Sequence, residues 1–161
     1  MPYQFEWRRP EEEADEILLR NVRKHGCLIL SIPGDERGPG YAFSIGLFAN
    51  DCHAELIVFG LHRDDEAGVI NDVRDRVAAG RSYAAGDVCD DLLIDRRVCF
   101  VAVPLQAYAE YLGTAIWFYA KSPRPFPCLQ IVWADREGRF PWEAGCDEHV
   151  KRRQPVLRGF S

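Results

Sequence analysis

The feature that most constrains the fold is the stretch from Gly40 to Leu61, which reads GYAFSIGLFANDCHAELIVFGL. Two largely apolar runs, 41–48 and 52–59, flank a short polar segment. Runs of this length, bounded by turn signals, are typical of buried strands. We therefore expect two neighbouring strands here, with helices from both sides of the stretch packed around them.

The strand expected at 41–48 has two unlike faces, because successive side chains of a strand point to opposite sides. One face is large and apolar from Tyr41 to Leu47, whereas the other is small at Ser44 and Gly46. A small face lets another group approach the backbone closely. The pattern leaves open whether that group is a packed helix or a ligand.

The start of the next strand carries reactive side chains. His53 and Glu55 lie two positions apart, so in an extended backbone they project to the same side. A carboxylate this close raises the pKa of a histidine and orients its ring, as acid–base and metal sites require. The alternative is that both residues cap the mouth of a loop in solvent.

Apolar periodicity predicts the remaining elements. Helices are expected at 10–25, 64–79 and 104–119. Strands are expected at 27–32, 92–94, 98–103 and 128–133, and Pro33–Gly40 is expected to form a hairpin loop. We predict a single α+β domain over residues 1–161, with a mainly antiparallel sheet or a partly closed barrel and about three packed helices.

Two polar features fall outside the central stretch. Gln130 lies within the apolar run 128–133, where an unpaired buried amide costs on the order of 1–3 kcal/mol, so it needs a partner. The tail carries a basic cluster, most simply interpreted as solvated surface. That cluster consists of Lys151, Arg152, Arg153 and Arg158.

Composition limits the classes of function. The 161 residues include 20 basic and 25 acidic side chains, and this net charge of −5 argues against a nucleic-acid partner. No apolar run approaches the roughly 18 residues that span a bilayer, and residues 1–15 lack the apolar core of a signal peptide. We therefore expect a cytoplasmic protein without a membrane partner, whose six cysteines form no disulfides.

Several short sequence blocks, each present once, follow one another in a definite order over most of residues 12–157. They are His25-Gly26-Cys27, Tyr41–Leu47, His53–Leu56, Gly60-Leu61, Leu129–Trp133 and Asp135–Trp142. In this order and spacing the chain resembles the bacterial family catalogued as domain of unknown function 4262. Ala54 departs from the family pattern, which has a proline between the histidine and the glutamate. The resemblance implies no particular reaction.

The hypothesis we favour is a domain that binds a small molecule or cofactor in a pocket near the 41–55 strand and loop. Its candidate ligand-binding residues are Ser44, Gly46, His53, Glu55 and Gln130. The succession of Phe-Ser-Ile-Gly-Leu, a short loop and an apolar strand is loosely similar to flavin-binding split-barrel domains. Flavin is therefore one candidate cofactor, although fold alone does not imply function.

Two alternatives come from other classes. The chain could be a cysteine- or metal-dependent enzyme in which His53 and Glu55 act with one of Cys27, Cys52 or His25. It could instead be a non-catalytic interaction module, which its acidic balance and the expected exposure of Trp142 permit. The sequence contains no closely spaced pair of cysteines of the kind that indicates a zinc site. Whether a reaction is catalysed, and the oligomeric state, stay open.

Overall fold

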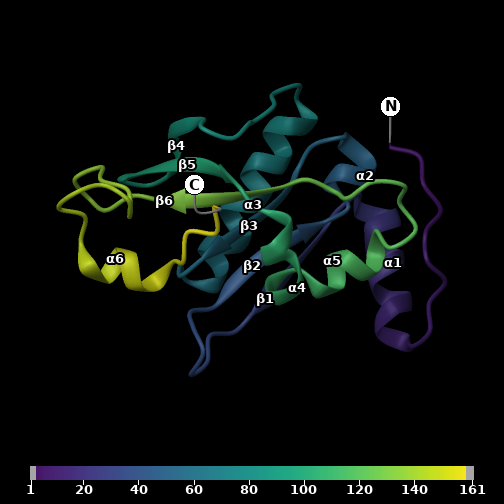
Figure 1. Ribbon diagram of the computed structural model, residues 1–161. Coiled ribbons are helices and arrows are strands. Elements are labelled where there is room, and N and C mark those ends of the chain that lie inside the picture. The colour runs from purple at the N-terminus through teal and green to yellow at the C-terminus, as the bar shows by residue number, and fades with distance from the viewer. Residues whose placement is uncertain (1–2, 159–161) are drawn as a thin grey trace.

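The chain folds around one six-stranded sheet. The computed structural model describes residues 3–158 and orders the strands β1-β2-β3-β6-β5-β4 (Figure 1). Neighbours pair antiparallel except β3 and β6, which run parallel. The strands are β1 (Leu28–Ile32), β2 (Tyr41–Ile45), β3 (Glu55–Phe59), β4 (Val88–Leu93), β5 (Arg96–Ala102) and β6 (Cys128–Trp133).

Helices connect and cover the strands. Within residues 3–158 they are α1 (Glu13–His25), α2 (Leu47–Asp51), α3 (Arg63–Ala78), α4 (Tyr108–Tyr111), α5 (Gly113–Phe118) and α6 (Glu148–Arg153). The sheet keeps two edges, β1 and β4, so it is open and does not close into a barrel. The predicted α+β class with a mainly antiparallel sheet is confirmed. No described helix is long and apolar enough to cross a membrane.

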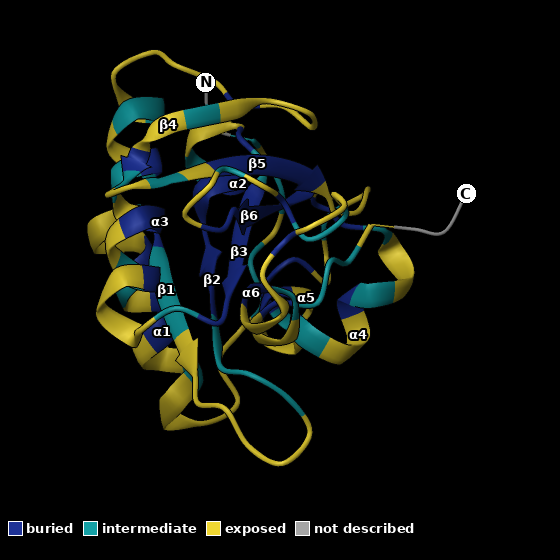
Figure 2. Cartoon of the chain, turned by 90° about the vertical axis from the view of Figure 1, so that its left-hand side faces the viewer, coloured by how far each residue is buried: buried dark blue, intermediate teal, exposed yellow. Residues whose placement is uncertain are grey.

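Apolar side chains cover both faces of the sheet. Alternation along β3 sends Ile57 and Phe59 to one face and Leu56 and Val58 to the other. The first face packs against α1, α4, α5 and the aromatic residues at positions 3–7, and the second packs against α3. Figure 2 shows the central strands buried, while the outer surfaces of α1 and α3 are exposed. Both layers therefore hold the central strands in place.

The prediction of a strand at 41–48 is wrong for the second half of that range. β2 ends at Ile45, and the chain then turns into the short helix α2. Gly46 has a φ of 109°, a left-handed conformation that glycine adopts readily, and this turns the backbone out of the sheet. The next strand starts at Glu55 instead of Cys52, because Cys52 has a φ of 55° and is not extended.

Two further boundaries differ from the predictions. The helix predicted at 104–119 breaks at Leu112, whose ψ of 30° is not helical and which precedes a glycine. The strand predicted at 92–94 starts earlier, since β4 begins at Val88. Since β4 is an edge strand with mostly exposed side chains, it lacks the apolar periodicity that marks a buried strand. Trp142, expected to be exposed, is half-buried and stacks on Phe140.

Candidate functional site

A buried carboxylate lies at the centre of the sequence-predicted site. Glu55, the first residue of β3, is 0% exposed. Its Oε1 accepts a hydrogen bond from the Ser44 hydroxyl at 2.7 Å, and the Tyr119 hydroxyl donates to Oε2. The backbone N–H groups of residues 46–48 add three more bonds of 2.9–3.2 Å. Five donors therefore converge on one side chain.

This cluster stabilises the turn from β2 into α2. The first N–H groups of a helix have no partner within the helix, and a carboxylate satisfies them. Burial raises the pKa of the Glu55 carboxyl, while the hydrogen bonds from Tyr119, Ser44 and the backbone oppose that rise by favouring the ionised form. The Ser44 oxygen also accepts the Leu56 N–H at 2.9 Å. The hydrogen-bonding capacity of Ser44 and Glu55 is thus used within the protein.

Gly46 shows what approaches the small face of the strand. A Cβ atom at Gly46 would lie 2.8 Å from the Gly26 carbonyl oxygen and 2.9 Å from Cγ1 of Val22. The Asn50 side-chain amide donates to the same Gly26 oxygen at 2.7 Å. At this position a helix end, the C-terminus of α1, occupies the space that the sequence leaves open for either a helix or a ligand.

His53 engages different partners from Glu55. Its Nδ1 donates to the Ala54 carbonyl at 2.9 Å, and its Nε2 accepts the Tyr83 N–H at 3.0 Å, which defines the neutral Nδ1–H form. The expectation that His53 and Glu55 project to the same side is wrong. His53 precedes β3, and its partner Tyr83 belongs to the core on the opposite sheet face from Tyr119, the partner of Glu55.

Gln130 has the partners that its burial requires. Its Nε2 donates to the Pro155 carbonyl at 2.7 Å, and its Oε1 accepts the Leu157 N–H at 2.8 Å. Gln130 therefore fastens the C-terminal segment across β6. Of the five predicted residues, the structure brings together Ser44, Gly46 and Glu55. It leaves the other two in separate hydrogen-bonded positions, and ligand binding by the set stays a prediction.

Burial also raises the pKa values of most of the cysteine thiols. Burial raises the pKa of Cys27 to about 12 and that of Cys128 well above its ordinary value. The pKa values of Cys89, Cys99 and Cys146 are raised for the same reason. A catalytic cysteine needs a thiolate near neutral pH, which burial disfavours at these five positions. Cys52 is exposed. Within residues 3–158, no group of three or more His, Cys, Asp or Glu side chains is placed to hold a metal ion.

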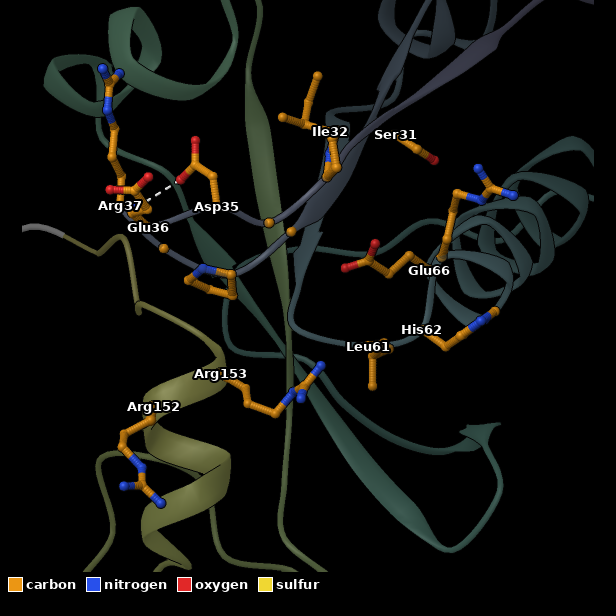
Figure 3. Close-up of a pocket in the computed structure, with 16 residues that line it drawn as sticks. Ser31, Ile32, Asp35, Glu36, Arg37, Leu61, His62, Glu66, Arg152 and Arg153 are labelled. Atoms are coloured by element: carbon orange, nitrogen blue, oxygen red, sulfur yellow. Dashed lines mark hydrogen bonds between the residues drawn. The ribbon is translucent and has the colours of Figure 1, made fainter.

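An open cleft of about 840 Å³ lies at the other end of β2 and β3 (Figure 3). We call it the hairpin cleft, because the Pro33–Gly40 loop forms one wall; Leu61–Arg63, the first turn of α3 and the end of α6 form the others. Gly34 and Gly40 close the neck of the loop, since a Cβ atom at either would lie 2.8–2.9 Å from the other's backbone nitrogen. Small-molecule sites measure about 300–1,000 Å³, so the cleft is large enough for one.

Glu66 lines the hairpin cleft from the first turn of α3 and is only 3% exposed. Its Oε2 is the one buried side-chain polar atom within residues 3–158 that lacks a hydrogen-bond partner. Burial raises the pKa of Glu66 to about 7, while the backbone of Leu61 and Gly60 and the Arg153 guanidinium oppose the rise. An unpaired buried group costs on the order of 1–3 kcal/mol, so the fold keeps an unfavourable oxygen beside this cleft.

Arginines dominate the walls of the hairpin cleft. They are Arg37, Arg63, Arg152 and Arg153. None of the four forms a salt bridge with a carboxylate of the described chain. Arg153 Nε donates to the Gly60 carbonyl at 2.6 Å and so fastens α6 to the loop after β3. Arg152, Arg153 and Arg158 of the tail cluster are exposed, as predicted, and Arg153 also lines one wall of the open cleft (Figure 3).

The sequence predictions missed Glu66 because an acidic residue at a helix start is explained by the helix dipole. One signal could have found it. Glu66 precedes Val69, Ile70 and Val73 by three, four and seven positions, so it shares their buried face of α3. A carboxylate on an apolar helix face is expected to have partners for both oxygens, and here Oε2 has none within residues 3–158.

The open, mainly antiparallel sheet, with a buried glutamate at the start of β3 holding the turn into α2, defines an α+β domain. A protein-family model described as "Domain of unknown function (DUF4262)" matches residues 21–147, which is more than half of the chain. The chain belongs to this family, as the sequence blocks implied. Comparisons with curated proteins and with solved structures found no match.

Proposed function

We propose that this domain binds a small molecule in the hairpin cleft. The observation that carries the proposal is the Glu66 Oε2 atom, buried without a partner at the edge of a cleft of about 840 Å³. A donor group on a ligand would satisfy this oxygen. The terminal torsion of a glutamate has broad, roughly two-fold wells, so the carboxylate can rotate to present Oε2 to the cleft at little cost.

The nature of the partner follows from charge and chemistry. The net charge of −5 favours a small molecule over a nucleic acid, and the free thiols of the buried cysteines favour a cytoplasmic setting. Flavin stays a candidate cofactor, and visible absorbance of the purified protein tests it directly. The sequence-predicted site around Ser44, Gly46 and Glu55 is the competing location, in which a ligand would have to displace an internal hydrogen bond.

The two locations can be separated by amide chemical shifts. A fragment library is titrated into ¹⁵N-labelled protein, and the perturbed backbone amides are assigned. Binding in the hairpin cleft shifts the amides of Gly34, Gly38, Gly40 and Leu61. Binding at the sequence-predicted site shifts the amides of residues 46–48 instead, because these donate to the Glu55 carboxylate.

Two variants complete the test. Glu66→Met removes the buried acceptor with little change of volume and is expected to abolish fragment binding in the cleft. Asp65→Asn, at the exposed neighbouring position of α3, is the matched control and should bind like the natural protein. If no fragment shifts the cleft amides, or if Glu66→Met binds the same fragments equally well, the proposal fails.

A further inference from the structure

The charges around the hairpin cleft indicate what kind of ligand suits it, and this inference rests on the proposed function. We infer that the cleft takes a small anion, a carboxylate or a phosphate monoester, that also carries an amine. Glu66 accepts the amine, and the cleft arginines bind the anionic group. The cleft therefore selects for both groups in one molecule.

The inference that the ligand carries an amine follows from the unpaired Oε2 atom of Glu66. This Oε2 lacks a hydrogen-bond donor, and none of the cleft arginines forms a salt bridge with it. An ammonium group supplies three N–H donors together with a positive charge. Hydrogen bonds between charged partners are roughly twice as strong as neutral ones, so an ammonium satisfies an ionised Glu66 better than a neutral donor does.

The inference that the ligand also carries an anionic group follows from the numbers of arginines and carboxylates that line the cleft. Four arginines line the cleft against three carboxylates, those of Asp35, Glu36 and Glu66. An ammonium bound to Glu66 leaves the four arginines facing only two carboxylates. An anion on the same ligand restores the balance, and guanidinium groups match the planar fork of carboxylate and phosphate oxygens.

The two binding features lie on either side of one short segment. Arg153 Nε holds the Gly60 carbonyl oxygen at 2.6 Å, and the Glu66 N–H holds the His62 carbonyl oxygen at 2.9 Å. Figure 3 shows the Glu66 side chain pointing toward the hairpin loop and Arg153 extending from α6 toward the same space. One molecule in the cleft can therefore meet both Glu66 and Arg153, since both line it.

Matched pairs of probes test this selection. Phosphoethanolamine is compared with ethyl phosphate, and β-alanine with propionate, by titration of the cleft amides at low ionic strength. Each pair shares its anion and differs in the amine, and the two pairs separate a phosphate from a carboxylate preference. We expect the amine-bearing member of at least one pair to bind at least about tenfold more tightly, equivalent to 1.4 kcal/mol.

Three variants assign the preference to residues. Glu66→Gln keeps the shape of the side chain but removes its charge, so the preference for the amine should fall below about twofold. Arg152→Ala is expected to weaken both members of the preferred pair and leave their ratio unchanged. Asp65→Asn, whose side chain is exposed outside the cleft, should change neither quantity.

The possible outcomes are distinct. Equal affinity within both pairs, an unchanged preference in Glu66→Gln, or no binding by any of the four probes each overturns the inference on the ligand class. If fragments still shift the cleft amides in those cases, the proposed function stands with a different ligand. If neither fragments nor probes shift these amides, both the function and the ligand class are rejected.

Discussion

Replacing Glu66 by Gln should remove a pH dependence from the stability of the fold. Burial raises the pKa of Glu66 from 4.5 to about 7 in the folded protein. Between these values the folded state keeps a proton that the unfolded state has lost. The folded protein therefore loses stability as the pH rises from about 4.5 to about 7, and stability contributed by this group is greatest in acid.

The size of the effect follows from the same two values. One unit of pKa corresponds to about 1.36 kcal/mol, so the full shift is about 3 kcal/mol. Between pH 5 and pH 8 the free energy of unfolding of the natural protein should fall, relative to that of Glu66→Gln, by about 2.5 kcal/mol. Groups with lowered pKa values, such as Asp91 and Asp135, act in the opposite direction but are present in both proteins and cancel in the difference.

Urea unfolding monitored by tryptophan fluorescence measures this difference at pH 5, 6, 7 and 8. Asp65→Asn, one position earlier and exposed, is the control, and its difference from the natural protein should stay flat. A difference for Glu66→Gln that varies by less than about 0.5 kcal/mol over this range would refute the reasoning. It would mean that Glu66 ionises alike in the folded and unfolded chain and that its buried oxygen is already satisfied.

The other predictions concern the residues that hold the two ends of β3. Tyr119→Phe removes one donor to the Glu55 carboxylate and should cost about 2 kcal/mol in urea unfolding, whereas Glu55→Ala, which frees all five donors, should cost roughly 3–5 kcal/mol. His53→Ala should cost about 1–3 kcal/mol, because it leaves a buried N–H unpaired; an unchanged midpoint would show that water replaces the ring. Gly60→Ala should cost roughly 2–4 kcal/mol, since its Cβ would lie 2.2 Å from a backbone oxygen at a φ of 78°. Gly68→Ala, in open space on α3, should instead add up to about 1 kcal/mol, and equal effects of the two glycine changes would contradict the close contact at Gly60.

The sequence predicted the main elements because their causes are local. Apolar residues at helical spacing marked α1 and α3, and short apolar runs marked β1, β5 and β6. A glycine is typical of the position after a helix end, and Gly26 caps α1 with a φ of 80°. The blocks between His25 and Trp142 also predicted the family. All of these signals act within a few residues of the positions that they describe.

Tertiary contacts decided what the local pattern left open. The apolar run 41–48 stops being a strand at Gly46, because the end of α1 packs on this glycine and the following amides bind Glu55. His53 and Glu55 are two positions apart but have partners on opposite faces of the sheet. The Tyr83 N–H binds His53 on one face, and the Tyr119 hydroxyl binds Glu55 on the other.

The sequence by itself determined which segments become helices and strands and which side chains are apolar enough to bury. Only the tertiary structure decided that Glu55 is saturated with donors while one oxygen of Glu66, Oε2, is left without a donor. Both are acids at the start of an element, and their local sequences do not distinguish them. The difference arises from groups far away in the chain, Tyr119 in one case and the residues of the hairpin cleft in the other, which only the folded chain brings together.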